Sequence, residues 1–386
     1  MSEQTQSPNS NQLHIDKQEL IDGVIEWISH ETPTYEAEVI NRLADLIQVQ
    51  FETINAEIER HPGEQGFGDT LYAHVAGQDQ GPGILVLSHI DTVHPIGTAM
   101  GDNKIRIEGD LLYGPGVYDM KAGAFIAHYA ARHLHRSGLK PKLPVTFMYV
   151  PEEEIGSPYS RRLIEAAAAK AKYVLVTEPA RDGGKLVVSR KGVGRFDLKT
   201  IGRPSHSGSK HEDGRSSVKE MARLILEIEA MTDYDKGVTF NVGQIKGGTA
   251  VNVVPRECSI ELDMRVVTEE QGEDYLARVF ALQSSDPNVK LIVEGEINRP
   301  PYEATEATMD LFQVARECAG EGGLDLHTTV TTGGGSDGNF TAAMGIPTLD
   351  GMGADGAGAH TLDEYVLISS LVPRAEMWWR LLAQLT

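Results

Sequence analysis

The spacing of hydrophobic residues predicts alternating helices and strands along the first half of the chain. Apolar positions recur at helical intervals in residues 15–30 and 35–60. Short apolar runs typical of strands follow at 70–76, 84–90, 145–151 and 173–179. The segments between the last three runs, 121–137 and 158–170, have helical composition. Buried strands alternating with helices are typical of a mostly parallel sheet covered on both faces, so we expect an α/β fold.

The pattern changes near residue 185. Polar and apolar residues alternate in 185–202 and 259–267, helical spacing appears at 216–231 and around 269–283, and a further strand is predicted at 290–297. This order predicts a small α+β (ferredoxin-like) layer. Helices at 308–320 and 370–385 then return to the first style. We expect a disordered tail (1–14), a large domain (15–184 and 299–386) and an inserted domain (185–298).

Composition narrows the possible partners and the compartment. Acidic residues outnumber basic ones by 56 to 35, and a net charge of −21 argues against nucleic-acid binding. No apolar run approaches the roughly 20 residues of a membrane helix. The polar start, "MSEQTQSPNSNQ", does not resemble a secretory signal. Cys258 and Cys318 are predicted to be free, buried thiols, which favours a reducing cytoplasm.

Polar side chains follow the predicted strands at the points where those strands end. His89 and Asp91, in "SHIDTVHP", end the run at 84–90, the triplet 152–154 follows 145–151, and Glu178 ends the run at 173–179. Ligands of open α/β sheets bind beyond the carboxyl ends of the strands. A solvated turn is the simpler explanation for the triplet taken alone.

Two glycine-rich loops add further metal-ligating residue types. Asp119 lies in "YGPGVYDMKAG" and His360 in "GAGAHTLDEYV". Asp119 alone is explained as a helix N-cap and His360 as an exposed loop residue. The whole collection, however, supplies the two imidazoles, one bridging carboxylate and two terminal carboxylates that a pair of zinc ions about 3.5–4 Å apart requires. The predicted ligands are His89, Asp119, Glu154, Glu178 and His360.

Asp91 is predicted to orient His89 and not to bind metal. A ligating histidine usually donates its second ring N–H to a carboxylate. In an extended segment, residues two apart point to the same side, so His89 and Asp91 face the same way.

Eight motifs occur in an order that resembles the co-catalytic zinc aminoacylase/carboxypeptidase family, and the chain looks closest to its folate-cleaving glutamate carboxypeptidase branch. Acetylornithine deacetylase and succinyl-diaminopimelate desuccinylase belong to the same family. The motifs are "SHIDTVHP", "YGPGVYDMKAG", "PEEEIGS", "VTEPA", "PSHSG", "NVVP", "TGGGSD" and "GAGAHTLDEYV". The resemblance covers the chain from about residue 16 onward. It implies a zinc-binding catalytic domain interrupted by a lid domain that also forms a homodimer.

The resemblance also implies a role for each site residue. His89 and Glu178 would bind one metal, Glu154 and His360 the second, and Asp119 would bridge them. Alignment of "EEEIGS" on its Gly-Ser end makes Glu153 the general base. His206, in "PSHSG", resembles a histidine that stabilises the oxyanion from across the dimer.

Substrate-binding residues are predicted in the inserted domain and in one glycine loop. Asn252 and Arg265 resemble substrate-binding positions of the family, and Arg299 is a further candidate. Backbone N–H groups of Gly334 and Gly335, in "GGGSD", are suited to an anion because glycine permits close approach and positive φ. A simple tight turn is the alternative explanation for this loop.

The predicted function is amide-bond hydrolysis that releases an amino acid, as a glutamate-carboxypeptidase-like exopeptidase. The predicted cofactors are two Zn²⁺ per chain, with Co²⁺ or Mn²⁺ as possible substitutes. The substrate would be a small peptide or an N-acyl amino acid. An N-acyl-amino-acid deacylase would use the same metal site, and a metal-binding protein without catalysis is a third possibility. Glu153 and His206 argue against the third.

Overall fold

A computed structural model describes residues 13–386, and the chain divides into two compact units. The first unit comprises the chain up to Val188, Ala304–Val330 and Ser336–Thr386, and the second comprises Ser189–Glu303 with Thr331–Gly335. The sequence pattern predicts these boundaries at 184/185 and 298/299. Most of the tail predicted at 1–14 lies outside the described residues.

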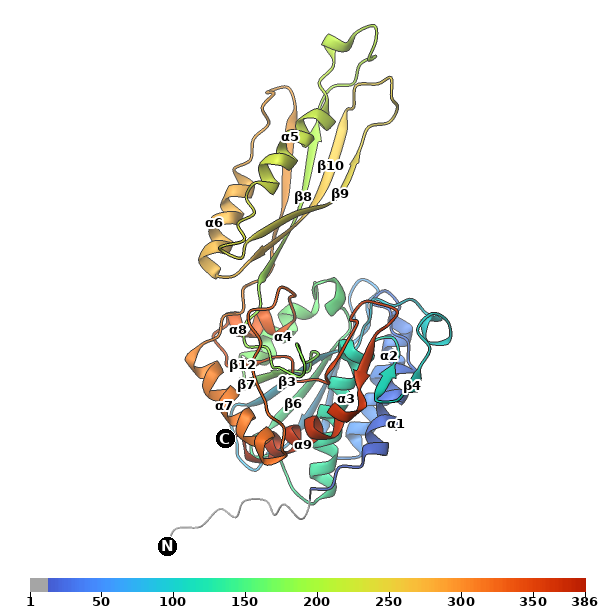
Figure 1. Ribbon diagram of the computed structural model, residues 1–386, viewed down its shortest axis with the longest axis vertical. Helices are drawn as coiled ribbons and strands as arrows, with labels where there is room; N and C mark the ends of the chain where they lie inside the picture. The colour runs from blue at the N-terminus through green and yellow to red at the C-terminus, as the bar shows by residue number, and fades with distance from the viewer. Residues whose placement is uncertain (1–12) are drawn as a thin grey trace. The chain divides into compact units, whose positions relative to one another are not determined.

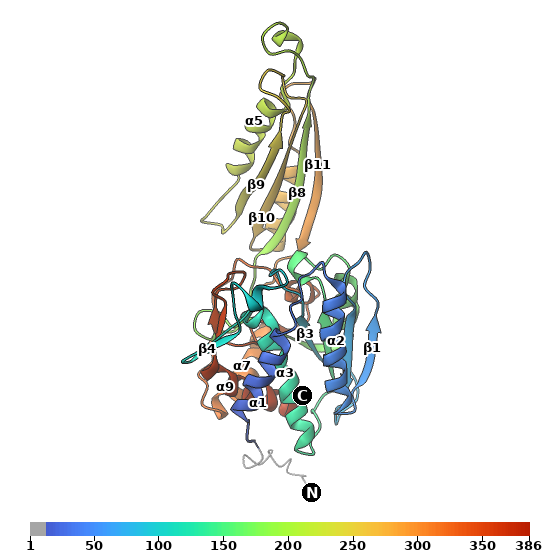
Figure 2. The ribbon, with the colours of Figure 1, turned by 90° about the vertical axis from the view of Figure 1, so that its right-hand side faces the viewer.

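The first unit is built on a six-stranded sheet in the order β1-β2-β6-β3-β7-β12 (Figures 1 and 2). Strand β3 pairs in parallel with β6 and β7, and β12 pairs in parallel with β7, whereas β1 and β2 form an antiparallel edge. The mostly parallel sheet of the predicted α/β fold is therefore confirmed. The strands are β1 (Glu57–His61), β2 (Thr70–Val75), β3 (Gly83–His89), β6 (Val145–Val150), β7 (Ala171–Val176) and β12 (Thr348–Leu349).

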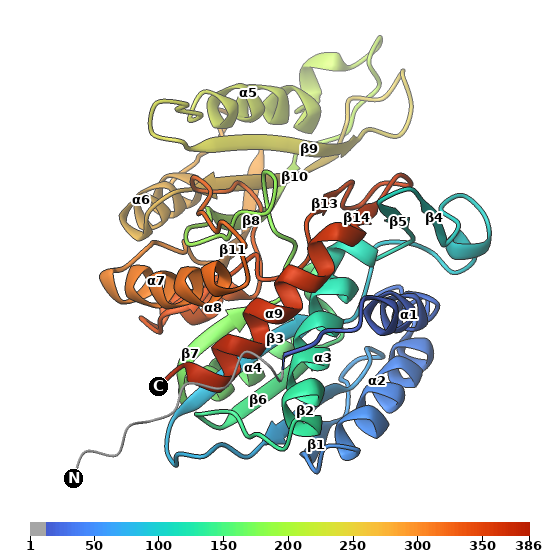
Figure 3. The same ribbon diagram turned by 60° about the horizontal axis from the view of Figure 1, so that its bottom comes forward.

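Helices cover both faces of this sheet, because its central strands are apolar on both sides. Ile84 and Val86 of β3 belong to the larger core, whereas Leu85 and Leu87 belong to a second core on the opposite face. Helices α3 and α9 lie side by side on the larger core (Figure 3). The helices of the larger core are α1 (Lys17–Ile28), α2 (Ala37–Glu52), α3 (Ala122–Arg136), α7 (Glu306–Glu321) and α9 (Ile368–Gln384). Those of the second core are α4 (Ser160–Ala168) and α8 (Gly338–Ala343).

Several short strands of the first unit differ from the sequence expectation. The helix predicted over 35–60 ends at Glu52, Asn55 adopts a left-handed φ of 58°, and β1 begins at Glu57. A second, antiparallel sheet in the order β13-β14-β5-β4 was not predicted, because strands of two or three residues are too short to show a hydrophobic period. Its strands are β4 (Arg106–Glu108), β5 (Leu111–Tyr113), β13 (Gly356–Ala357) and β14 (Tyr365–Leu367).

The second unit is an antiparallel sheet in the order β11-β8-β10-β9, whose apolar side packs on two helices. Strand β9 was not predicted, because it is an edge strand whose residues are mostly exposed and polar or glycine. Alternation in β10 is clear, with Cys258, Ile260, Leu262 and Met264 all buried. The elements are β8 (Gly192–Ile201), α5 (Ser217–Glu229), β9 (Thr239–Gly247), β10 (Glu257–Val266), α6 (Glu269–Phe280) and β11 (Lys290–Arg299).

Among residues 13–386, no helix has both the length and the apolar character needed to cross a membrane. Cys258 and Cys318 are free and buried, as predicted.

His128 is a buried ionisable residue in the larger core. Its ring packs against Trp27, Phe51 and Phe125. Neither ring nitrogen has a hydrogen-bond partner among the described residues. Burial lowers the pKa of His128 to about 3, so the folded chain keeps this ring neutral at any moderate pH.

We expect His128→Leu to make the stability of the protein less sensitive to acid. Below about pH 6.5 the unfolded chain binds a proton at this position and the folded chain does not, so protonation favours unfolding. Between pH 7.5 and 5, urea denaturation should show the wild type losing about 2 kcal/mol more unfolding free energy than the variant. The matched control is His135→Leu, at an exposed position of the same helix. Equal acid sensitivity in wild type and His128→Leu would contradict the prediction.

Candidate metal centre

The structure brings the five predicted metal ligands together at the carboxyl ends of β3, β6 and β7. Asp119 lies between the two imidazoles, with Oδ1 3.1 Å from His89 Nε2 and Oδ2 3.4 Å from His360 Nε2. Glu178 Oε1 lies 3.8 Å from His89 Nε2, and Glu154 Oε2 lies 3.0 Å from His360 Nε2. The first pair of residues around Asp119 is therefore His89 with Glu178, and the second is His360 with Glu154.

The donor set and its spacing fit two metal ions. Two ligands held at about 2.0–2.2 Å from one tetrahedral zinc ion lie about 3.4 Å apart. The four nitrogen–oxygen distances range from 3.0 to 3.8 Å. Asp119 would offer one oxygen to each ion, as a bridging carboxylate does. Groups of three ligand atoms within 4.8 Å of one another also occur in His89–Asp119–Glu154 and in His89–Glu153–Glu178.

Asp91 connects His89 to the segment that carries the acidic triplet. Its carboxylate oxygens accept hydrogen bonds from the backbone N–H groups of Glu153 (3.1 Å) and Glu154 (3.2 Å), and from the Thr34 hydroxyl (2.7 Å). His89 Nδ1 lies 3.0 Å from the backbone oxygen of Asp91 and 3.4 Å from its carboxylate. The buried Asp91 thus contacts the His89 ring and also positions Glu153 and Glu154, which follow strand β6.

The three glutamates of the triplet point to three different environments. Glu152 accepts hydrogen bonds from the backbone N–H of Ser160 (2.6 Å) and from its hydroxyl (2.6 Å), so it caps the start of α4. Glu153 belongs to the ligand group around His89, and Glu154 contacts His360. The geometry therefore separates one helix cap from two residues of the metal centre.

Close backbone packing brings the Asp119 loop to the end of β7. A Cβ atom on Gly123 would lie 2.1 Å from the backbone oxygen of Thr177, and one on Gly353 would lie 2.6 Å from the same oxygen. Only glycine permits this approach. It places the start of α3, shortly after Asp119, directly beside Glu178.

His360 reaches the centre from a tight glycine loop. Its φ is 63°, in the left-handed region that residues other than glycine seldom adopt, and Gly358 has a φ of 84°. The side chain is 55 % exposed, whereas that of His89 is 1 % exposed. The His360 side of the centre therefore faces solvent.

The electrostatics of the site favour positive charge. Burial lowers the pKa of His89, but hydrogen bonds to Asp119 and Asp91 outweigh burial and raise it well above 6.5. Hydrogen bonds to Asp119 and Glu154 raise the pKa of His360 to about 11. Burial opposes ionisation of Asp119, yet the same two imidazoles hold its pKa well below the usual value. Divalent cations would take the place of these protons on the imidazoles.

His206 and Asn252 are neighbours in the second unit. Ser207 N–H donates to the backbone oxygen of Asn252 (3.0 Å). The exposed His206 ring accepts hydrogen bonds at Nδ1 from the backbone N–H groups of Gly208 (3.1 Å) and Ser209 (3.2 Å). An acceptor at Nδ1 places the hydrogen of the neutral ring on Nε2, which makes Nε2–H a donor.

The glycine loop at 333–335 lies against arginine side chains of the same unit. Arg265 donates to the backbone oxygen of Gly333 (3.2 Å) and forms a two-pronged ion pair with Asp263. None of the three glycines has a positive φ, so that part of the sequence argument was wrong. The constraint at Gly335 is steric, because a Cβ atom there would lie 2.7 Å from Cδ of Arg299.

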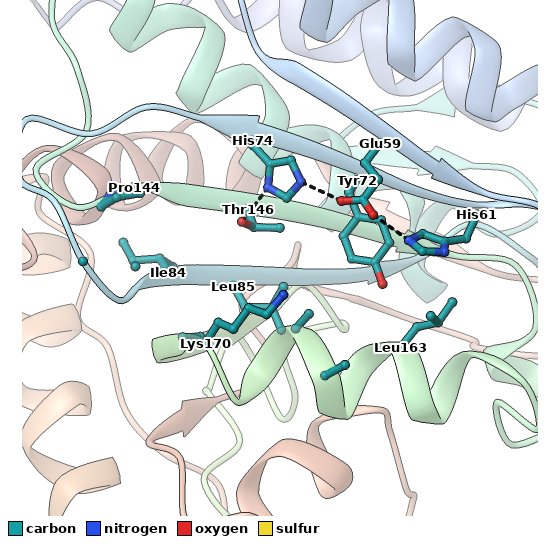
Figure 4. Close-up of a pocket in the computed structure, with 15 residues that line it drawn as sticks. Glu59, His61, Tyr72, His74, Ile84, Leu85, Pro144, Thr146, Leu163 and Lys170 are labelled. Atoms are coloured by element: carbon teal, nitrogen blue, oxygen red, sulfur yellow. Dashed lines mark hydrogen bonds and ion pairs between the residues drawn. The ribbon is translucent and has the colours of Figure 1, made fainter.

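A separate pocket lies between one face of the central sheet and helix α4 (Figure 4). It has a volume of about 400 Å³ and is lined by β1, β2, α4 and the amino ends of β3 and β6, whereas the metal centre follows the carboxyl ends. The Glu59 carboxylate lies between two imidazoles, 2.8 Å from His61 Nε2 and 3.5 Å from His74 Nε2. This pocket is therefore distinct from the metal centre.

Comparison with known proteins agrees with this geometry. The family described as "Peptidase family M20/M25/M40" matches residues 85–384. The chain belongs to this family. Carboxypeptidase G2 from Pseudomonas sp. (strain RS-16) is 30 % identical over 368 residues, covering 93 % of this chain and 87 % of that protein. The chain is therefore a metal-dependent M20 peptidase related to carboxypeptidase G2.

Solved M20-type structures share the fold. A tripeptidase from Staphylococcus aureus superposes with a TM-score of 0.78 at 21 % identity, covering 95 % of this chain and 98 % of that one. A Bacillus subtilis protein described as a dinuclear metal binding peptidase from M20 family has a TM-score of 0.67 at 18 % identity, covering 95 % and 96 %. These similarities extend over both units of the chain.

Sequence reasoning missed two residues that contact the ligand segments. Thr34 donates to Asp91, and Glu364 accepts from the backbone of Asp119. Glu364 stands inside the motif "GAGAHTLDEYV", but an acidic residue in a polar loop shows no sign of burial in the sequence.

Proposed function

We propose that this M20 peptidase is a di-zinc exopeptidase that releases a C-terminal amino acid with an acidic side chain. The observation that carries the proposal is the position of Asp119, with one carboxylate oxygen directed at each of two imidazoles. In this proposal the first unit is the catalytic domain and the second is a lid. Co²⁺ or Mn²⁺ would fit the same nitrogen and oxygen ligands.

Glu153 is the proposed general base. Divalent ions held by the five ligands would lower the pKa of a bound water toward about 7 and polarise the substrate carbonyl. Glu153 would accept the proton of the attacking water and deliver it to the departing amine. The hydrogen bond from its backbone N–H to Asp91 fixes the start of the side chain beside the ligand group.

His206 is the proposed oxyanion donor, because its Nδ1 already accepts two hydrogen bonds and Nε2–H is left to donate. Arg265, whose guanidinium group is oriented by two hydrogen bonds to Asp263, is suited to bind a substrate carboxylate. Asn252, Gly334 and Gly335 are the further proposed substrate contacts. These roles follow the family resemblance.

We also propose a homodimer formed through the second unit. Strand β9 is the edge of its sheet, and Ile245 on that strand is 56 % exposed. An open edge strand presents unpaired backbone groups that pair with another chain. Light scattering should give twice the chain mass of 42.0 kDa, and a mass of one chain would contradict the dimer.

The buried, free Cys258 and Cys318 agree with the proposed cytoplasmic location.

A substrate panel tests the proposed function. The zinc-loaded protein is incubated with dipeptides, folate-like conjugates ending in glutamate, and N-acetyl amino acids, and the released amino acid is measured. We expect the highest kcat/KM on substrates that end in glutamate or aspartate. Preference for short N-acyl groups would instead indicate a deacylase. No hydrolysis of any amide with zinc, cobalt or manganese would contradict an active enzyme.

A further inference from the structure

Glu364 places a buried carboxylate against the backbone of the Asp119 loop. Its Oε1 accepts hydrogen bonds from the backbone N–H groups of Tyr118 (2.8 Å) and Asp119 (2.9 Å). Its Oε2 accepts from the backbone N–H of Gly116 (2.7 Å) and lies 3.0 Å from His94 Nε2. The side chain is 1 % exposed, so water does not compete for these bonds.

These contacts hold the Asp119 loop in a non-helical conformation just before helix α3. Asp119 has φ −114° and ψ 94°, outside helical values, and α3 begins only at Ala122. Gly116 has a positive φ of 70°. Three backbone N–H groups of this loop, those of Gly116, Tyr118 and Asp119, have their acceptor outside it, and that acceptor is the Glu364 carboxylate.

Glu364 and Tyr118 connect the Asp119 loop to the segments that carry two other predicted metal ligands. Glu364 lies four residues after His360, on the loop that delivers the second imidazole. The Tyr118 hydroxyl donates to the backbone oxygen of Ala180 (2.6 Å), two residues after Glu178. The Asp119 loop is thus attached both to the His360 segment and to the Glu178 segment.

We propose that Glu364 is a positioning residue of the metal centre, which holds Asp119 between the two metal-binding positions. This inference rests on the proposed function, because it takes Asp119 as the bridge. A bridging carboxylate must present both oxygens at fixed points, and groups that orient a ligand typically change metal affinity by about 10–100-fold when removed. The "HTLDE" segment would therefore supply both a ligand, His360, and the group that orients the bridge.

Glu364→Gln is the discriminating variant, because glutamine has nearly the same shape but only one acceptor oxygen. In one orientation its NH₂ group would face the Tyr118 and Asp119 N–H donors, and in the other it would face the Gly116 N–H donor. We expect zinc affinity, measured by competition with a chromogenic chelator, to fall about 10–100-fold for at least one ion. We expect kcat to fall with little change in KM, because Glu364 lies behind the ligands and not at the predicted substrate contacts.

The matched control is Glu220→Gln in the second unit. Glu220 is also buried and accepts hydrogen bonds from the Ser285 N–H (2.8 Å) and hydroxyl (2.7 Å). Its variant should lower thermal stability and leave zinc affinity unchanged. A Glu364→Gln protein that loses stability but binds two zinc ions with wild-type affinity would overturn the inference, since its role would then be structural only.

Glu364→Asp keeps the inference testable if the glutamine variant does not fold. Aspartate retains two acceptor oxygens but is shorter by one methylene, so zinc affinity should fall below that of the wild type and of the Glu220→Gln control. Wild-type zinc affinity together with wild-type kcat in Glu364→Asp would overturn the inference. A wild-type chain that binds fewer than two zinc ions would instead contradict the proposed function itself.

Discussion

Replacement of Glu153 by glutamine is expected to lower kcat by about 10²–10⁴-fold, with zinc content unchanged at two ions per chain. Glutamine cannot accept the proton of the attacking water, but it keeps the size of the side chain. The backbone N–H would still donate to Asp91, so the ligand segment should stay in place. Steady-state kinetics and metal analysis of the same preparation measure both quantities.

The neighbouring Glu152→Gln variant is the control for this prediction. Glu152 is equally acidic and adjacent in sequence, yet its carboxylate caps α4 through Ser160. Its variant should keep kcat within a few-fold of wild type. A full loss of activity in Glu152→Gln together with normal activity in Glu153→Gln would reverse the assignment within the triplet.

Asp119→Asn is expected to remove at least one metal ion per chain and to reduce kcat/KM by about a thousandfold or more. The amide NH₂ group cannot ligate a cation. One of the two metal positions, beside His89 or beside His360, therefore loses its Asp119 oxygen ligand. Inductively coupled plasma analysis of the dialysed protein counts the ions directly.

Asp69→Asn serves as the comparison for Asp119→Asn. Asp69 also uses both carboxylate oxygens, toward Gly63 N–H (2.9 Å) and Arg60 Nε (2.8 Å), but it contacts none of the predicted ligands. This variant should retain two zinc ions. Two tightly bound ions in Asp119→Asn would show that this carboxylate is not the bridge.

The positions of the metal-site residues in the sheet could be read from the sequence, because they follow apolar strands. Parallel strands end at one edge of a sheet, so His89, Glu153 and Glu178 had to lie near one another once the strands were recognised. The direction of each side chain in the triplet could not be read in this way. Glu152 binds the start of α4 at Ser160, eight residues along the chain, and the sequence does not show which of three adjacent carboxylates makes that contact.

The residues that sequence reasoning missed act through backbone geometry. Glu364 binds main-chain N–H groups of a loop some 245 residues away, and no residue pattern reports such a contact. The 333–335 loop shows the opposite error, since its glycines suggested positive φ and the structure instead places Arg299 against Gly335. Strands β4, β5, β13 and β14 are held by pairing with one another and carry too few residues for a hydrophobic period.

A crystal structure of the zinc-loaded protein with anomalous diffraction data at the zinc edge tests the central claim most directly. The account predicts two anomalous peaks about 3.5–4 Å apart, one beside each oxygen of Asp119. One peak should contact His89 and Glu178, and the other should contact Glu154 and His360. A single peak, or two peaks without Asp119 between them, would contradict the account.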